Sequence, residues 1–450
     1  MNPWGGTGRW GVVAAGLMVA SSSAAWAQPT NRSPFLIDLP ATLRLAGARN
    51  LDIQVARQGL QEAEANHLRA LEQFFPWLAP GIGYQRRDGL AQAVPAGTLT
   101  DAHFDAYAPG VGVGAQVDLG GAIYQSLATR QLVKAANAGL EAQRLDALLS
   151  AAQGYLDLAQ ARALVGVVEE ALHISRDYQG QLHEAVAAGI AFKGDELRVQ
   201  TQTERYQIAL RQAQERQRVL AAALAALLHL DSRVELVPLA TDPAPLTLVE
   251  AQTAIDPLVE QALRLRPELK RSQALVGAAR AEKQAAVVGP LIPSLGAQVF
   301  AGGLGGGPDN GPSAFGSSEE LLVGLSWRLG PGGLFDTGRQ RARQARLEST
   351  RLSGEKLRDQ ITAEVVQSLT RVRSLADQLA LARRNLVTAR DTWQLTHARK
   401  DYGVGLVLED IQAQQALAQA RAEYVTVIAE FDKAQYDLNK AVGGAPPLLP

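Results

Sequence analysis

Apolar and small side chains near the end of the chain repeat every seven residues. Before a glycine-containing turn at residues 402–406 they are separated by alternating steps of four and three residues, and the same spacing resumes after the turn. Such heptads require a partner helix, because each side chain fills a hole between side chains opposite. We therefore predict a helical hairpin over residues 336–442, with a first arm roughly 100 Å long at 1.5 Å per residue. The positions are Ile361, Val365, Ser368, Val372, Leu375, Leu379, Ala382, Leu386, Ala389 and Trp393, then Leu417, Tyr424, Ile428, Phe431, Leu438 and Val442.

Four shorter stretches alternate between apolar residues and polar or small ones, which is the pattern of strands with two different faces. In the clearest stretch Val111, Val113 and Val117 lie on one face, while Gln116 and Asp118 lie on the other. The predicted strands cover residues 81–88, 110–119, 294–301 and 320–329.

The same order of elements occurs twice along the chain. A first repeat (28–230) holds a helix over 41–75, two strands and a helical hairpin over 122–230. A proline-containing linker (231–256) follows, then a second repeat (257–443) with a helix over 257–288, two strands and the hairpin over 336–442, and a tail over 444–450. Pro80 corresponds to Pro293, 213 residues later, and Gly189 to Gly405, 216 residues later. Matching elements at nearly constant spacing indicate an internal duplication.

Residues 1–27 have the features of a secretory signal peptide. Arg9 precedes a short apolar run, and Ala25-Trp26-Ala27 is a typical cleavage site. A single membrane anchor is the alternative, although the run is too short to span a bilayer comfortably. The chain has no cysteine, which excludes disulfides, thiol chemistry and a lipid-modified N-terminal cysteine. We expect an exported protein.

Composition and motifs give no sign of an enzyme or of a nucleic-acid-binding protein. The formal net charge is −1, and no basic stripe is interleaved with aromatic residues. The six histidines show no metal-ligand spacing, so we expect no metal site and no cofactor. The glycine-rich residues 302–307 lack the Gly-Lys-Ser/Thr of a phosphate-binding loop, and no catalytic residues are identified.

The four strands are long enough to cross a membrane. About nine residues with one apolar face suffice for a tilted strand in a bilayer. Four strands cannot close a barrel, and open sheet edges are not tolerated in lipid, so such a chain would have to oligomerise. Three copies would supply twelve strands. Two soluble hairpins packed on the helices remain the alternative from the pattern alone.

The duplicated layout resembles the TolC-like outer membrane efflux protein family over essentially the whole mature chain. The resemblance is carried by Pro80 and Pro293 before the first strand of each repeat, and by the two hairpin turns. It is also carried by the pairs Gly120-Gly121 and Gly332-Gly333 after the second strand. The family implies a mainly α fold with a β membrane part, in which a homotrimer forms a twelve-stranded β-barrel continued by an α-helical barrel.

The resemblance also implies a location and a function. The protein would lie in the outer membrane of a Gram-negative bacterium, in contact with outer-membrane lipid, and would extend into the periplasm. It would be a passive channel, the exit duct of a tripartite efflux or type I secretion system. Its partners would be a periplasmic adaptor (membrane fusion) protein and an inner-membrane transporter.

Family members close the duct at the hairpin turns with a tyrosine that is hydrogen-bonded to an aspartate. Tyr402 and Asp195 match this gate by position, and Glu409 and Asp410 match a ring of acidic side chains that concentrates negative potential in the pore. The spacing from Gly405 to Glu409 is two residues shorter than in the first turn, which leaves the direction of these acids open. An acid just after a turn also stabilises a helix N-terminus without any gate.

The resemblance places the adaptor-docking surface at the same turns. Its residues would be Gly189 and Ile190 in the first turn and Val404, Gly405 and Leu406 in the second. Glycines permit tight turns, and exposed leucine or isoleucine offers apolar contact. The alternative is an ordinary connection between helices.

Two other functions remain open. A structural or adaptor-type periplasmic coiled coil without a pore would explain the heptads and the signal peptide, but not the recurring strand pairs. A secretion duct for proteins would have the same fold, because the inner-membrane partner selects the cargo.

Overall fold

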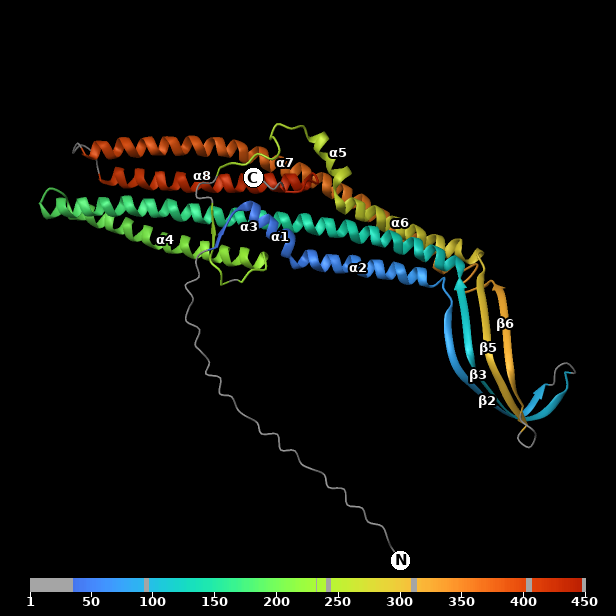
Figure 1. Ribbon diagram of the computed structural model, residues 1–450. Coiled ribbons are helices and arrows are strands. Elements are labelled where there is room, and N and C mark those ends of the chain that lie inside the picture. The colour runs from blue at the N-terminus through green and yellow to red at the C-terminus, as the bar shows by residue number, and fades with distance from the viewer. Residues whose placement is uncertain are drawn as a thin grey trace, which may run out of the picture.

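The computed structural model describes residues 35–92, 97–231, 233–239, 244–308, 314–401 and 407–446. These residues form a long helical rod with a four-stranded sheet at one end and the ends of two helical hairpins at the other (Figure 1). The fold is mostly helical, as the sequence predicts.

Two continuous helices run along the rod, and shorter helices lie beside them. The continuous helices α3 (Leu119–Ala187) and α7 (Thr337–Asp401) contain 69 and 65 residues. Each forms a hairpin with the helix that follows it, α4 (Lys193–Leu227) or α8 (Val407–Ala441). The remaining helices are α1 (Leu39–Arg49), α2 (Leu51–Glu72), α5 (Ile255–Leu265), α6 (Pro267–Val287) and the 3₁₀ turn η1 (Gly289–Leu291).

Two helices predicted as single, over 41–75 and 257–288, are each interrupted. Asn50 leaves the helical conformation and caps α2, because its side chain accepts hydrogen bonds from the backbone N–H groups of Asp52 and Ile53. Arg266 separates α5 from α6, since the following Pro267 disfavours the helical conformation in the residue before it.

The sheet contains β2 (Trp77–Gln92), β3 (Leu99–Asp118), β5 (Ser294–Pro308) and β6 (Ala314–Ser326), in the order β2-β3-β5-β6 and antiparallel throughout. All four strands are longer than predicted, and in β5 this is because the glycine-rich residues 302–306 continue the ladder instead of forming a loop. β6 begins six residues earlier than predicted and ends three residues earlier, at Ser326, and Leu119 begins α3 rather than ending a strand. β2 and β6 are the two edges of the sheet.

A second, two-stranded sheet was not predicted. β1 (Phe35–Ile37) precedes the first helix of the first repeat, and β4 (Leu236–Pro238) lies in the linker. The two strands pair in parallel near the middle of the rod (Figure 1).

The heptad rows form the core of the second hairpin. Ile361, Val365, Val372 and Leu375 are buried against the apolar side of α8. The buried side chain in this stretch is Leu369, whereas the neighbouring Ser368 of the predicted row is only partly buried. The shift by one position follows from the helical repeat of 3.6 residues, which drifts relative to a strict heptad.

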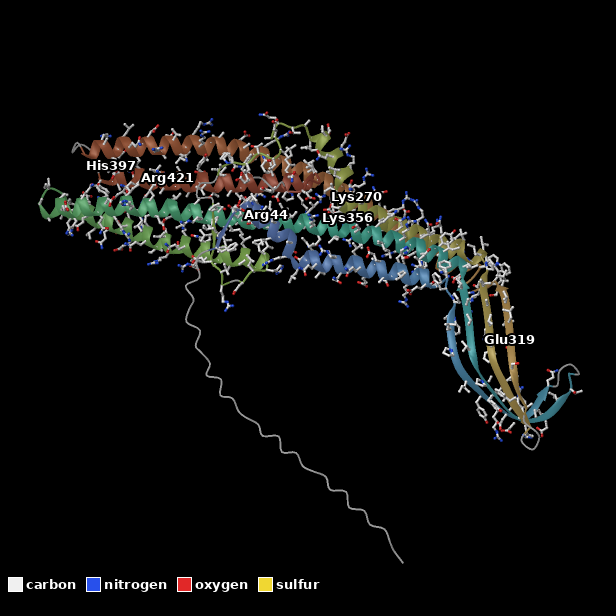
Figure 2. The ribbon with its side chains drawn as sticks, in the orientation of Figure 1. Arg44, Lys270, Glu319, Lys356, His397 and Arg421 are labelled. Carbon is white, nitrogen blue, oxygen red and sulfur yellow. The ribbon has the colours of Figure 1, made fainter. Side chains whose placement is uncertain are left out.

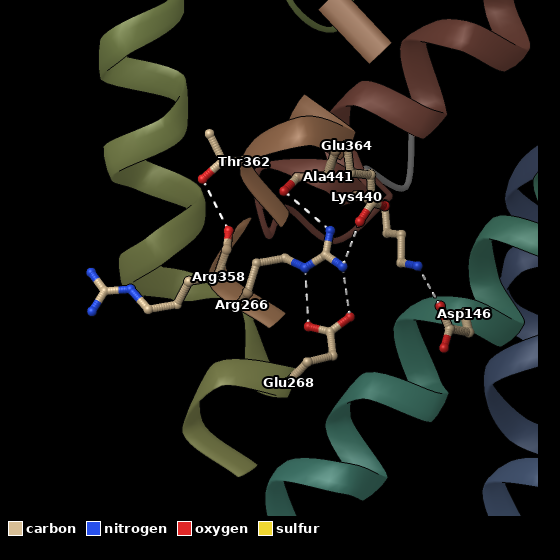
Figure 3. A network of polar contacts seen from close by, with 8 residues as sticks. All are labelled: Asp146, Arg266, Glu268, Arg358, Thr362, Glu364, Lys440 and Ala441. Atoms are coloured by element: carbon tan, nitrogen blue, oxygen red, sulfur yellow. Dashed lines mark hydrogen bonds and ion pairs between the residues drawn. The ribbon is translucent and has the colours of Figure 1, made fainter. Parts of the chain in front are cut away.

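Polar contacts join the short helices to the long ones. The guanidinium of Arg266 is only 5% exposed and donates to Glu268 in α6, to Glu364 in α7 and to the carbonyl oxygen of Ala441 in α8 (Figure 3). The two Arg266–carboxylate distances in the ion pairs are 2.9 and 3.0 Å. Three helices therefore converge on one buried cation.

The linker is held on α8 by two buried side chains. The backbone N–H of Leu246 donates to Asp432 (2.7 Å), and those of Leu248 and Val249 donate to Gln435 (3.1 and 2.9 Å). Burial raises the pKa of Asp432 to about 7, although the hydrogen bond from Leu246 favours the ionised form. The linker is thus a fixed part of the rod.

The helices follow the same lateral order as the strands. Near the sheet, α2 packs on α3, α3 on α6, and α6 on α7. Towards the hairpin ends, α4 packs on α3, α3 on α8, and α8 on α7. One edge of the protomer is therefore formed by α7 and β6, and the other by β2, α2 and α4.

Candidate functional site

The first hairpin ends in a tight turn built around Gly189. The N–H of Gly189 donates to the carbonyl of Val186 (3.0 Å) and that of Ile190 to the carbonyl of Ala185 (2.9 Å), which is a Schellman motif. The φ of Gly189 is 76°, in the left-handed region that glycine adopts without steric cost. Ile190 is 81% exposed and the nearby Phe192 is 73% exposed. The predicted docking residues Gly189 and Ile190 thus lie at the end of the rod furthest from the sheet (Figure 1).

The predicted gate residue Asp195 lies in the first turn of α4. Its carboxylate accepts a hydrogen bond from Arg198 (2.8 Å) of the same helix and is 24% exposed. An acid at this place also stabilises the N-terminus of α4 through the helix dipole. Its predicted partner Tyr402 lies outside the described residues, so the Tyr402–Asp195 gate stays a prediction.

The second turn is described only from Val407 onwards. The predicted docking residues Val404, Gly405 and Leu406 lie outside the described residues. Glu409 and Asp410 both lie in the first turn of α8, but Glu409 is partly exposed, whereas Asp410 is completely buried within the single chain. Of these two acids, Glu409 is the one with access to solvent.

Asp410 faces two polar side chains. Gln414 donates to its Oδ2 (3.1 Å), and Nδ1 of His397 on α7 lies 3.4 Å from its Oδ1. The ring of Trp393 stacks on that of His397, with centroids 5.5 Å apart. His397 is near the end of the second hairpin in Figure 2. The contact therefore joins the two arms of this hairpin close to its turn.

The first hairpin has a histidine and a carboxylate at the corresponding place, and there the two are hydrogen-bonded, whereas His397 and Asp410 are close without a hydrogen bond. Nδ1 of His183 on α3 lies 2.9 Å from Oε1 of Glu196 on α4, and Nζ of Lys193 lies 2.6 Å from Oε2. Hydrogen bonds from His183 and then Lys193 hold the pKa of Glu196 below its usual range. His183 and His397 are 214 residues apart, and so are Glu196 and Asp410. We call these two histidine–carboxylate pairs the hairpin clasps.

Tyr178 of α3 lies between the two hairpins. It is buried with Leu182, Val199 and Ile411, which belong to α3, α4 and α8. Burial raises the pKa of its hydroxyl, and the negative charges of Asp410 and Asp195 raise it further. Tyr178 therefore lies close to two of the predicted gate acids, although its helical position gave no sign of this in the sequence.

The two faces of the sheet have different compositions. The register places one set of side chains on a common face: Leu78, Ile82, Val111, Val113, Val117, Leu295, Val299, Leu321, Val323 and Leu325. This face ends at Tyr84, Tyr107 and Phe315, and the rings of the last two stack at 6.0 Å. The opposite face carries mainly glycine and polar residues such as Gln116 and Gln298. An apolar band bordered by aromatic rings is typical of the lipid-facing side of a membrane-spanning sheet.

Glu319 on the edge strand β6 interrupts the apolar face (Figure 2). It pairs in register with Ala301 of β5.

Neither a metal cluster nor a membrane-spanning helix is found in the part of the chain that the structure describes. No three His, Asp, Glu or Cys side chains among those residues are arranged to hold a metal ion. None of the helices described combines the length and hydropathy required to cross a membrane.

The structure is a rod of two similar helical hairpins joined to a sheet with one apolar face, which is the architecture of a class of outer-membrane channel proteins. Comparison with known proteins supports this assignment. A family model described as outer membrane efflux protein matches residues 42–229 and 258–444. The chain belongs to that family, because the match covers most of its length. No curated protein matches the sequence.

Solved structures share the fold at low sequence identity. A membrane protein from Pseudomonas aeruginosa is 18% identical, with a TM-score of 0.76 over 90% of each chain. The outer membrane protein VceC from Vibrio cholerae is 18% identical, with a TM-score of 0.72 over 90% of this chain and 96% of that one. The open state of the Neisseria gonorrhoeae MtrE outer membrane channel is 16% identical, with a TM-score of 0.72 over 90% of this chain and 89% of that one.

Family membership confirms the predicted class, fold and location. The protein is an efflux channel of the Gram-negative outer membrane with a periplasmic extension, and it is a conduit rather than an enzyme.

Proposed function

We propose that this chain is the exit duct of a tripartite efflux or type I secretion system. In this proposal three copies close a twelve-stranded barrel and a helical tunnel. The duct docks a periplasmic adaptor and, with it, an inner-membrane transporter, and it supplies no energy itself.

The main support for the proposal is that each side of the protomer, over the residues that the structure describes, ends in a strand and a helix with no neighbour on their outer side. In the described part of the chain, β2 and β6 each pair with one other strand. The helices follow the same lateral order, so α7 ends one side and α2 and α4 end the other. Unpaired strand edges cannot face lipid. A ring of identical chains, in which one edge of each copy meets the other edge of the next, removes every edge at once.

The composition of the sheet supports the same arrangement. The apolar face with its aromatic border would contact lipid, and the face of glycine and polar residues would line the lumen. Glu319 lies on the edge strand β6, where the β2 strand of the next copy would lie alongside it. Its carboxylate would therefore be partly covered by protein.

The exposed apolar side chains at the hairpin end support adaptor docking there. Ile190 and Phe192 are exposed at a hydrogen-bonded turn at the far end of the rod, where an adaptor protein can reach them. In the proposed closed state, Tyr402 bonds Asp195, and Glu409 supplies negative charge at the pore. Val404, Gly405 and Leu406 would contribute the second half of the docking surface.

Conductance of the purified protein in a planar bilayer tests both the duct and its gate. We expect a small, cation-preferring conductance that increases in a Tyr402→Phe/Asp195→Ala variant. Tyr124→Phe/Asp359→Ala makes the same chemical changes away from the turns and should conduct like the wild type. If the gate variant also conducts like the wild type, the gate is wrong but the duct stands. A folded sample that never conducts would contradict the duct.

A further inference from the structure

The face of the sheet that carries glycine and polar residues ends, next to the rod, in two rows of small side chains. In the first row Gln116 of β3 pairs in register with Gly296 of β5, and Gly296 pairs with Gly324 of β6. The next row towards the rod consists of short polar side chains: Asp118, Ser294 and Ser326. Glycine and serine fill little space, so this corner between the sheet and the helices is left open (Figure 1).

Two adjoining hollows occupy this corner. The first has a volume of about 520 Å³ and extends to Trp327 and Arg328, which follow β6. The second has a volume of about 800 Å³ and extends to Glu72, Phe75 and Trp77, at the end of α2 and the start of β2. The two hollows share these lining residues: Gln116, Asp118, Ala285 and Arg339. We call the two hollows together the junction groove. It crosses the sheet from β2 to β6, roughly 14 Å at about 4.8 Å per strand spacing, which is the scale of a site for a small organic molecule.

The half of the junction groove near β6 is basic. Among the residues that the structure describes, no side chain forms an ion pair or a hydrogen bond with the guanidinium of Arg328 or of Arg339. Asp336 is close in sequence, but its carboxylate accepts the backbone N–H groups of Gly332 and Arg339, both at 2.9 Å. The two guanidiniums are therefore available to an anionic group, to which arginine presents paired N–H donors.

Asp118 lies where the two hollows meet, and its charge is already engaged. Its carboxylate caps α3 by accepting the backbone N–H of Gly121 at 3.1 Å. The positive end of the helix dipole stabilises an acid in this position. The first hollow thus contains one capped acid and two arginines without a partner side chain, Arg328 and Arg339, which leaves it with a net positive charge.

The half of the junction groove near β2 is acidic and aromatic. Trp77 is 59% exposed, and its ring lies over Gly114, where an added Cβ would be 2.7 Å from the ring. Phe75 is exposed beside it, and Glu72 forms no ion pair with another described residue. Aromatic rings stack on other rings and attract cations through their faces. A carboxylate next to such rings completes a site for an aromatic amine.

We infer that the junction groove binds zwitterionic aromatic molecules inside the duct. The anionic group of such a molecule lies between Arg328 and Arg339, and its ring and ammonium group lie against Trp77, next to Glu72. This inference rests on the proposed duct, because there the glycine and polar face of the sheet lines the passage that the cargo enters. A molecule with only one of the two charges leaves the other end of the groove unpaired, so it binds more weakly.

The probe for this site is aminoethylamino-naphthalenesulfonate (EDANS), a fluorescent zwitterion with an ammonium group at one end and a sulfonate at the other. Equilibrium dialysis against the wild-type protein in lipid nanodiscs, at low ionic strength, should show saturable binding with a Kd below about 1 mM. Naphthalenesulfonate lacks the ammonium group and naphthylethylenediamine lacks the sulfonate, so each should bind several-fold more weakly. No saturable binding of EDANS, or equal binding of all three probes, would overturn the inference.

Variants separate the two ends of the groove. Arg328→Gln/Arg339→Gln should weaken the binding of EDANS and naphthalenesulfonate several-fold and leave naphthylethylenediamine unchanged. Glu72→Gln should weaken the binding of the two amines and leave naphthalenesulfonate unchanged. The matched control Arg358→Gln/Arg384→Gln removes the same charge from exposed positions of α7 far from the groove and should bind all three probes like the wild type. If the control weakens EDANS as much as the groove variant does, the assigned place is wrong.

Tryptophan emission reports where the probe binds. After residue 27 the chain has three tryptophans: Trp77 and Trp327 line the groove, and Trp393 stacks on His397 near the hairpin ends. EDANS accepts energy from tryptophan, so binding should quench the emission. The quenching should persist in Trp393→Phe and decrease in Trp77→Phe. Quenching that disappears with Trp393 would place the probe at the hairpin ends and overturn the inference.

The outcomes separate the groove from the duct. A sample that conducts in a planar bilayer but does not bind EDANS contradicts the inference and leaves the duct proposal intact. A sample that binds EDANS with the expected response to the variants but never conducts keeps the groove and contradicts the duct. Glycerophosphoethanolamine has the two charges of a lipid headgroup without an aromatic ring and should not displace EDANS. Displacement would overturn the requirement for an aromatic ligand.

Discussion

The carboxyl group of Asp432 should make the stability of the rod depend on pH in an unusual direction. This side chain is 3% exposed, its pKa is raised to about 7 by burial, and it accepts the N–H of Leu246 from the linker. The usual pKa of an aspartate in an unfolded chain is about 3.9. Between these two values the folded protein binds the proton and the unfolded chain does not. The free energy of unfolding contributed by this group therefore falls as the pH rises from about 4 to about 7.

A shift of about three pKa units corresponds to about 4 kcal/mol, at about 1.4 kcal/mol per unit. Asp432→Asn removes the charge and keeps a side-chain oxygen that can accept the N–H of Leu246. We expect the variant to match the wild type near pH 4 and to be more stable by a few kcal/mol at pH 8.

Thermal unfolding of the detergent-solubilised protein, followed by circular dichroism at both pH values, measures the difference. Glu423→Gln removes a carboxylate from the exposed side of the same helix and serves as the control, with no expected dependence on pH. An Asp432→Asn variant that is less stable than the wild type at pH 8, or whose gain is the same at both pH values, would refute the reasoning.

Three further predictions concern single side chains. Gly189→Ala should lower the unfolding free energy by about 1 kcal/mol, because alanine is strained at a φ of 76°. Gly166→Ala in the middle of α3 should instead raise the unfolding free energy slightly. The melting temperatures of the two variants should therefore shift in opposite directions. Arg266→Ala removes the buried cation shared by three helices and should cost about 3 kcal/mol in denaturant unfolding, while Arg233→Ala at an exposed site should cost little. Glu196 has a lowered pKa, so its contribution to the unfolding free energy is present at neutral pH and lost on acidification. Glu196→Gln should therefore weaken the loss of stability at acidic pH. An unchanged loss would contradict the clasp between His183 and Glu196.

The periodic parts of this fold could be predicted from the sequence, because burial along one helix or strand face leaves a repeat in the residue pattern. The heptads before the second turn identified a core that includes Ile361 and Val372, and the alternation after Val111 identified β3. The helix break at Asn50 was missed, since a cap depends on one side chain rather than on a period.

The polar contacts at the hairpin ends were harder to predict. Asp410 follows a turn, which suggests an exposed acid, but its side chain is completely buried beside His397 and Gln414. Metal-ligand spacing does not detect a histidine that is paired with a carboxylate across a turn. A signal did exist: His183 and His397 are separated by nearly the same interval as the two halves of the duplication. Comparing polar residues between the repeats would have found both clasps.

The parallel pairing of β1 with β4 constrains the order in which this chain can fold. Phe35 pairs with Leu236, so the contact closes a loop of about two hundred residues that contains nearly all of the first repeat. Contacts between residues this far apart in the sequence form late in folding. Closing so long a loop costs conformational entropy, and contacts that have already formed must offset that cost. A chain entering the periplasm from its N-terminus therefore holds β1 without a partner until the α3–α4 hairpin is complete. Pairing of these two short strands would then mark the moment at which the first repeat has folded and the second can dock on it.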